Sequence, residues 1–149
     1  MQKFKQPLIL LIIGLLMVFG VVKHLNTPIT SAKTTPLNNK TMTTVMNEWK
    51  LKHHGHVYTK SEKLCEVANR RLEETKINWT HDGFWDISFP STGFTFLGEN
   101  LAKGFNNPKE VLYAWQTSKL GHKEILEYSY TNLCVATDGN YVVVMFGKE

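Results

Sequence analysis

The C-terminal stretch Tyr141-Val142-Val143-Val144-Met145-Phe146 constrains the fold most, because it is hydrophobic at every position. Successive side chains of a β-strand point to opposite faces of the sheet. A strand without polar alternation is therefore expected to be buried on both faces. The sequence thus predicts a small sheet that is covered by helices on both sides.

A second strand precedes this stretch. Leu133-Cys134-Val135-Ala136 ends shortly before Asp138-Gly139, a pair that favours the type I′ turn of a β-hairpin. The two strands are therefore predicted to pair in antiparallel fashion around this turn.

Apolar residues recur at helical spacing elsewhere in the chain. The predicted helices cover Met42 to about Lys52, the segment from the capping-box pattern Thr59-Lys60-Ser61-Glu62 to about Lys76, and the segment from Asn107-Pro108 to Gly121, with a short helix through Leu126. Residues 77 to 98 have no clear period and are predicted to be mostly loop. Helices followed by a terminal hairpin indicate the α+β class.

The N-terminal part is expected to lie outside the globular domain. Residues 7–22 carry no charged side chain, whereas Lys3 and Lys5 precede them and Lys23 follows. Such a helix spans ~24 Å, slightly less than the ~30 Å hydrocarbon core, and the flanking lysines can make up the difference. Residues 1–23 are therefore predicted to be a signal anchor, that is, an N-terminal transmembrane helix, with a cleaved signal peptide as the alternative.

Residues 24–41 are rich in Thr, Pro, Asn and Ser. This composition cannot bury enough apolar surface to offset the entropy of ordering, so the segment is predicted to be a flexible linker before a domain at 42–149. The N-terminal lysines favour a membrane-anchored protein whose domain is extracytoplasmic. Cleavage of the apolar segment would instead give a secreted protein.

The net charge of +4 belongs to the N-terminal part, where five lysines and no acidic residue occur in the first 41 positions. The rest of the chain carries 12 basic and 13 acidic side chains. A nucleic-acid-binding domain usually has a basic surface, so the charge distribution argues against nucleic acid as a partner.

The spacing of Cys65 and Cys134, the two cysteines, resembles no zinc or thioredoxin pattern. Outside the cell they can pair and close a loop of about 70 residues, which the chain-entropy model values at up to ~4 kcal/mol. Both lie in apolar stretches that are expected to face one core, which favours the disulfide. Two buried thiols that never meet are the alternative.

Three polar residues lie beside glycines or in glycine-flanked segments: His81, Glu99 and His122. Two imidazoles and a carboxylate can bind Zn²⁺ with an open fourth position, or share protons in a cleft. Because 18 and 23 residues separate the three, the spacing alone favours unrelated residues that make local hydrogen bonds.

Two further sets are weaker candidates. His53, His54 and His56 follow the first predicted helix and are expected to form an exposed helix end, with incidental metal capture as the alternative. Ser118 lies four residues before His122, but it lacks a nucleophile-elbow pattern. A nucleophilic set of Ser118 and His122 with Glu99 is therefore disfavoured.

Several short motifs occur in a specific order: Leu64-Cys65-x-x-Ala68-x-x-Arg71, His81, Gly98-Glu99-Asn100-Leu101-Ala102, Val111-x-x-x-Trp115-x-x-Ser118 and Gly121-His122-x-x-Ile125-Leu126. Together they resemble the CAP superfamily, which groups cysteine-rich secretory proteins, antigen 5 and plant pathogenesis-related proteins. The resemblance is strongest to its short bacterial branch, and it covers roughly residues 42–149.

This resemblance implies an α-β-α sandwich with a small three-stranded antiparallel sheet, in which residues 98–102 form the third strand. It also implies a cleft in which family members gather two His and two Glu. His81, Glu99 and His122 match three of these positions. Ser118 replaces the second Glu, and the lost carboxylate should weaken binding of a divalent cation. His81 and His122 remain candidate ligands for Zn²⁺ or another divalent cation.

The family does not share one reaction, because its members are variously linked to metal, sterol or lipid binding, protein interaction and disputed proteolysis. The first hypothesis is a non-enzymatic, membrane-anchored binding module that presents the His/Glu cleft to a metal, lipid, protein or cell-envelope ligand. The second is a Zn-dependent hydrolase of cell-envelope peptide or peptidoglycan, in which Glu99 acts as general base and His81 and His122 hold the metal. The predicted anchor, the missing carboxylate and the lack of a nucleophile pattern favour the first.

Overall fold

The computed structural model describes residues 35–149. The predicted signal anchor at 1–23 and residues 24–34 of the predicted linker lie outside the described residues. Within residues 35–149, no helix combines the length and the hydrophobicity that a membrane span requires.

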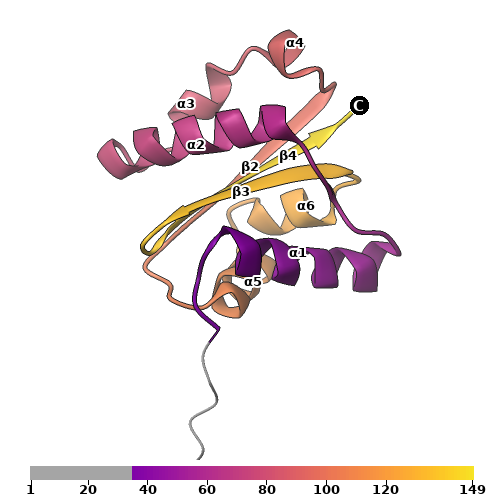
Figure 1. Ribbon diagram of the computed structural model, residues 1–149, viewed down its shortest axis with the longest axis vertical. Helices are drawn as coiled ribbons and strands as arrows, with labels where there is room; N and C mark the ends of the chain where they lie inside the picture. The colour runs from indigo at the N-terminus through magenta and orange to yellow at the C-terminus, as the bar shows by residue number, and fades with distance from the viewer. Residues whose placement is uncertain (1–34) are drawn as a thin grey trace, which may run out of the picture. The chain divides into compact units, whose positions relative to one another are not determined.

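A four-stranded sheet lies between helices on its two faces (Figure 1). Across the sheet the strands follow one another in the order β1 (Thr59–Lys60), β3 (Asn132–Asp138), β4 (Tyr141–Lys148) and β2 (Phe96–Lys103). Helix α2 (Glu62–Ile77) covers one face (Figure 1). The other face is covered by α1 (Asn39–His54), α5 (Pro108–Gln116) and α6 (His122–Glu127) (Figure 1). The architecture is therefore α+β, with helices on both sides of the sheet.

The predicted sheet of three antiparallel strands is wrong by one strand. β3, β4 and β2 are antiparallel to their neighbours, but β1 adds a fourth strand that runs parallel to β3. Thr59 pairs with Asn132 and Lys60 with Leu133. Two residues are too few to produce a periodic pattern, so this strand has no recognisable signal in the sequence.

β4 is buried on both faces, as predicted. Val142, Val144 and Phe146 belong to the core on the side of α1, α5 and α6. Val143 and Met145 belong to the core beneath α2. All five side chains are completely buried. The strand therefore joins the two hydrophobic cores.

The predicted hairpin between β3 and β4 is present, but its turn is not type I′. Asp138 pairs with Tyr141, which leaves Gly139 and Asn140 as the central residues. A type I′ turn needs positive φ at both, and among the described residues only glycines have it, with Gly139 at φ 57°. Glycine at the first central position is typical of the type II′ turn.

Helix α1 begins at Asn39, three residues earlier than predicted and within the predicted linker. The reason is a capping box, because Asn38 Oδ1 accepts a hydrogen bond from the Thr41 backbone and Thr41 Oγ1 accepts one from the Asn38 backbone. The capping box predicted at Thr59 is wrong. Thr59 belongs to β1, and Ser61 caps α2 instead.

The segment predicted to be mostly loop contains two one-turn helices, α3 (Asp82–Trp85) and α4 (Phe89–Thr92), before β2 begins. α3 follows His81 directly, and it lies next to α2 in Figure 1. This placement brings the first predicted cleft residue close to the sheet.

Cys65 and Cys134 form a disulfide with an S–S distance of 2.06 Å. It joins α2 to β3 across a sequence separation of 69 residues. Both cysteines belong to the core beneath α2. Residues 35–149 contain this disulfide, all four strands and both cores, so this part of the chain has the packing that it needs to fold alone.

We expect the variant Cys65→Ala/Cys134→Ala to lower the free energy of unfolding of residues 35–149 by up to ~4 kcal/mol, because the unfolded chain loses its cross-link. Urea denaturation of the two proteins measures the difference. A reducing agent should destabilise the wild type to a similar extent and leave the variant unchanged. Equal stability of the wild type and the variant would contradict the prediction.

Candidate functional site

Three of the four predicted cleft residues come together at β2, one of the two edge strands of the sheet. His81 precedes α3, Glu99 lies on β2, and His122 is the first residue of α6. The imidazole ring centroids of His81 and His122 are 6.0 Å apart. All three line a cavity of about 360 Å³, called the groove below, together with Phe84, Trp85, Leu97, Gly98, Leu120, Gly121, Ile125 and Tyr130.

A larger cavity, of about 480 Å³, lies beside β3 between α1 and α2. None of the predicted cleft residues lines it. The groove is therefore the candidate functional site.

An ion pair in the protein interior holds Glu99. The Glu99 side chain is 1% exposed, and its Oε2 accepts a hydrogen bond from Arg71 Nε at 2.7 Å. Its Oε1 accepts one from Arg71 Nη2 at 3.2 Å and lies 2.8 Å from His81 Nδ1. Both carboxylate oxygens therefore already have partners within the protein.

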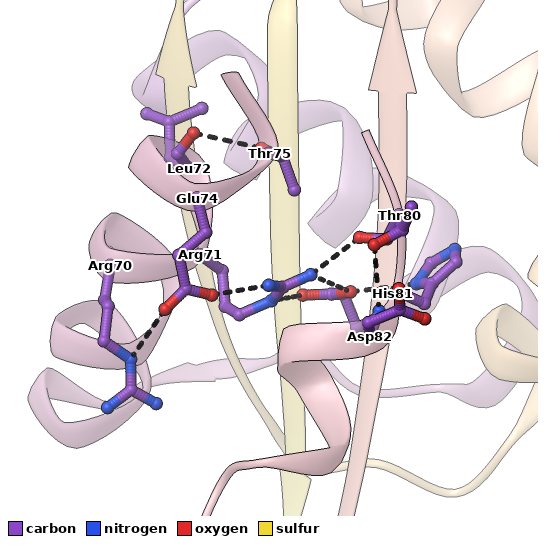
Figure 2. Close-up of polar contacts among 9 residues, drawn as sticks. Arg70, Arg71, Leu72, Glu74, Thr75, Thr80, His81 and Asp82 are labelled. Atoms are coloured by element: carbon purple, nitrogen blue, oxygen red, sulfur yellow. Dashed lines mark hydrogen bonds and ion pairs between the residues drawn. The ribbon is translucent and has the colours of Figure 1, made fainter. Parts of the chain in front are cut away.

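Arg71 connects this carboxylate to two other places in the chain (Figure 2). Its Nη1 donates to Glu74 on α2 at 2.5 Å, and its Nη2 donates to the backbone oxygen of Thr80 at 2.9 Å. Burial alone lowers the pKa of the guanidinium, but hydrogen bonds and charges from Glu99 and Glu74 outweigh burial and raise this pKa. The charge of Arg71 thus compensates that of Glu99.

The backbone at Gly83 packs directly on this network. A Cβ atom at this position would collide with Arg71 Nη1 and with Glu74 Oε2. Glycine therefore lets α3 approach α2 closely enough for His81, two residues earlier, to reach Glu99.

His122 is held by a different set of contacts. Its Nδ1 lies 2.9 Å from Ser118 Oγ, and its backbone oxygen accepts a hydrogen bond from Asn100 Nδ2 at 3.1 Å. The same Ser118 Oγ accepts a hydrogen bond from the Leu120 backbone at 3.0 Å. Ser118 does not line the groove, and its role is to contact the Nδ1 atom of His122.

Burial lowers the pKa of His122 below the ordinary value of 6.5, and the charge of His81 lowers it further, against a smaller opposing effect of Glu124. His122 is therefore predominantly neutral at pH 7. A neutral imidazole offers one hydrogen-bond donor and one acceptor.

The rest of the groove is largely apolar. Tyr130 lies over Gly98, where a Cβ atom would approach the phenol oxygen to 2.7 Å, and its hydroxyl donates to the Leu97 backbone at 2.9 Å. Trp85 is 75% exposed and Leu120 is 85% exposed, although both line the groove. The groove thus combines two imidazoles with an apolar wall and an exposed apolar rim.

The donor set does not fit a tightly held divalent cation. Glu99, the carboxylate of the set, has both oxygens engaged by Arg71 and His81. Ser118 stands in place of the second carboxylate, and a neutral hydroxyl is a poor zinc ligand. Among residues 35–149, no three or more His, Cys, Asp or Glu side chains are arranged to hold a metal ion.

The disfavoured nucleophilic set does not assemble, because Glu99 contacts His81 and not His122. The second histidine cluster lies at the end of α1, away from the groove. There His53 Nδ1 lies 2.8 Å from the Trp49 backbone oxygen, and the His53 ring stacks on that tryptophan.

Arg71 was not predicted to be a site residue, although it belongs to one of the sequence motifs. The signal was available, because Arg71 falls on the apolar face of α2 that Leu64, Ala68 and Leu72 define. Its neighbour Arg70 lies off that face, and its side chain is 57% exposed. A charged residue on an apolar helical face is expected to have a buried partner.

We expect Arg71→Met to lower the free energy of unfolding by about 3–5 kcal/mol, because it leaves Glu99 buried without a counter-charge. Arg70→Met is the matched control. Arg70 makes an exposed 3.6 Å ion pair with Glu74, so its loss should cost less than ~1 kcal/mol. Urea denaturation measures both variants, and equal losses would contradict the structure.

We also expect the pKa of His122 to lie below 6.5 and to rise in His81→Gln, because that variant removes a repulsive positive charge. At a pH between the lowered pKa of His122 in the folded chain and its ordinary value of 6.5 in the unfolded chain, the unfolded chain binds more protons than the folded chain. The free energy of unfolding should therefore fall as the pH drops below about 6.5. NMR titration of the His122 ring measures the pKa, with His56→Gln as the control. A His122 midpoint above 6.5 would contradict this account.

The fold resembles two solved bacterial structures. An extracellular protein containing an SCP domain from Bacillus anthracis matches with a TM-score of 0.61 and 18% identity over 75% of this chain and 40% of that chain. A cysteine-rich secretory protein from Staphylococcus aureus matches with a TM-score of 0.63 and 18% identity over 74% of this chain and 38% of that chain. This chain therefore spans only about 40% of the length of these proteins.

No family model matches the sequence, and no curated protein matches it either. The structural matches nevertheless agree with the fold that the motifs predict. The described residues have the fold of these two structures, one of which is described as containing an SCP domain.

Proposed function

We propose that the protein is a non-enzymatic, extracytoplasmic binding module whose groove holds an amphipathic organic ligand. The observation that carries the proposal is the pairing of His81 and His122 at one end of an otherwise apolar groove. A ligand with a polar head and an apolar body would match both parts.

The exposed rim supports this proposal. Exposed tryptophan and leucine side chains at the mouth of a cavity are typical of surfaces that become covered when a ligand binds. Trp85 and Leu120 come from different parts of the chain, α3 and the turn before α6. The side chains would therefore contact an apolar ligand body from two sides.

An extracytoplasmic location is supported by the Cys65–Cys134 disulfide, since disulfides persist mainly in oxidising compartments. The Bacillus anthracis structure is described as an extracellular protein, and the Staphylococcus aureus structure as a secretory protein. Tethering by the predicted anchor at residues 1–23 is part of the proposal.

The hydrolase hypothesis is less well supported. A general base must reach a water molecule or a substrate proton with an open lone pair. Glu99 would have that role, but Arg71 and His81 surround its carboxylate. Its contacts suit an orienting group better than a base.

A fluorescent amphipathic probe tests the proposal: the primary amide of 11-(dansylamino)undecanoic acid, added to residues 35–149. We expect saturable binding that weakens about tenfold in Leu120→Ser, because the ligand would no longer bury a leucine side chain. Ile77→Ser is the matched control, since Ile77 is 91% exposed and does not line the groove. Absence of binding, or equal losses in the two variants, would overturn the proposal.

A further inference from the structure

The two imidazoles of the groove have chemically different supports. His81 Nδ1 lies 2.8 Å from a carboxylate oxygen of Glu99, and a carboxylate only accepts hydrogen bonds. His81 must therefore carry its hydrogen on Nδ1. In the neutral ring, Nε2 then has a lone pair and accepts.

His122 is supported by a hydroxyl group that can donate. Ser118 Oγ accepts a hydrogen bond from the Leu120 backbone, and its own hydrogen can point to His122 Nδ1 at 2.9 Å. Among residues 35–149, no other acceptor contacts this hydroxyl. With Ser118 as the donor to Nδ1, the hydrogen of neutral His122 lies on Nε2, which then donates.

We propose that the groove recognises an uncharged polar group that donates a hydrogen bond to His81 Nε2 and accepts one from His122 Nε2, such as an amide or a hydroxyl. This inference rests on the proposed function and specifies the head group of its ligand. Both rings line the groove, and their centroids are 6.0 Å apart. The Nδ1 atom of each ring already has a hydrogen-bond partner, Glu99 for His81 and Ser118 for His122. Nε2 is thus the nitrogen that each ring offers to a ligand.

The same arrangement disfavours a divalent cation, because a metal ion needs a lone pair from every ligand. His122 could supply one only if its hydrogen moved to Nδ1, which would end the donation from Ser118. The groove therefore differs in its chemistry from the cleft of two His and two Glu that the family resemblance implies.

Arg71 acts in this proposal as a positioning residue. It orients Glu99 through two hydrogen bonds, and Glu99 in turn fixes the hydrogen of His81. The guanidinium is 2% exposed and does not line the groove. Its effect on a ligand is therefore transmitted through Glu99 and His81.

The tautomers are directly measurable. The full chain, labelled with [¹⁵N]histidine, is studied by solid-state ¹⁵N NMR at pH 8, with His81→Gln and His122→Gln to assign the signals. We expect the hydrogen on Nδ1 of His81 and on Nε2 of His122. Ser118→Ala should remove the preference of His122 alone. Ser91→Ala, a change at an exposed serine outside the groove, should alter neither ring.

The same tautomer on both rings of the wild type would overturn the inference. So would a stoichiometric change of both histidine signals on addition of one equivalent of Zn²⁺. The expected result of that addition is no change in either signal.

Matched probes separate this inference from the proposed function. The primary amide used above should bind to residues 35–149 at least ten times more tightly than 11-(dansylamino)undecanoic acid at pH 8, because the carboxylate has no hydrogen to donate. Tighter or equal binding of the acid would overturn the head-group inference while leaving a ligand-binding groove. Binding of neither probe would overturn both proposals.

Discussion

The buried ion pair between Arg71 and Glu99 is the interaction on which the site depends. It joins the helix on one face of the sheet to the edge strand beneath it. Removing two charges from water is expensive, and such a pair persists only when hydrogen bonds satisfy both partners. Here the guanidinium donates to two carboxylates and to the Thr80 backbone. Because Thr80 precedes His81, the same arginine fixes both the carboxylate and the start of the segment that carries the imidazole.

The rest of the fold holds α2 where Arg71 can make this pair. The Cys65–Cys134 disulfide fastens the first half of α2 to β3. Leu64, Ala68 and Leu72 pack in the core beneath the helix. On the opposite face of the sheet, Trp115 Nε1 donates to the Leu101 backbone at 2.9 Å, two residues beyond Glu99. β2 is thus held from both layers, although it is an edge strand, and the groove has a firm wall.

The sequence predicted the elements whose signals are long and periodic. The hydrophobic run of β4 implied burial on both faces, and the apolar spacing of α2 marked a helix that ends within one or two residues of the observed end. β1 could not be predicted, because two residues have no period, and its partner is more than 70 positions away. The meeting of His81, Glu99 and His122 followed from the family resemblance and not from spacing. Their hydrogen-bond partners are set by tertiary packing, and no local pattern in the sequence reveals them.

Ser118 shows why a shared fold does not carry a shared site chemistry. The family resemblance implies a carboxylate at this position in the eukaryotic members, where it would face the two imidazoles as an anion. A hydroxyl there removes a negative charge, and Arg71 compensates the charge of Glu99. The lining of the groove is then close to electrically neutral when both rings are neutral, and its remaining surface is mostly apolar. A neutral, largely apolar site gains little from a small, strongly hydrated cation, whose desolvation it cannot offset. It would gain more from a group that loses little hydration energy and completes two hydrogen bonds, which is why the proposed ligand has a polar but uncharged head.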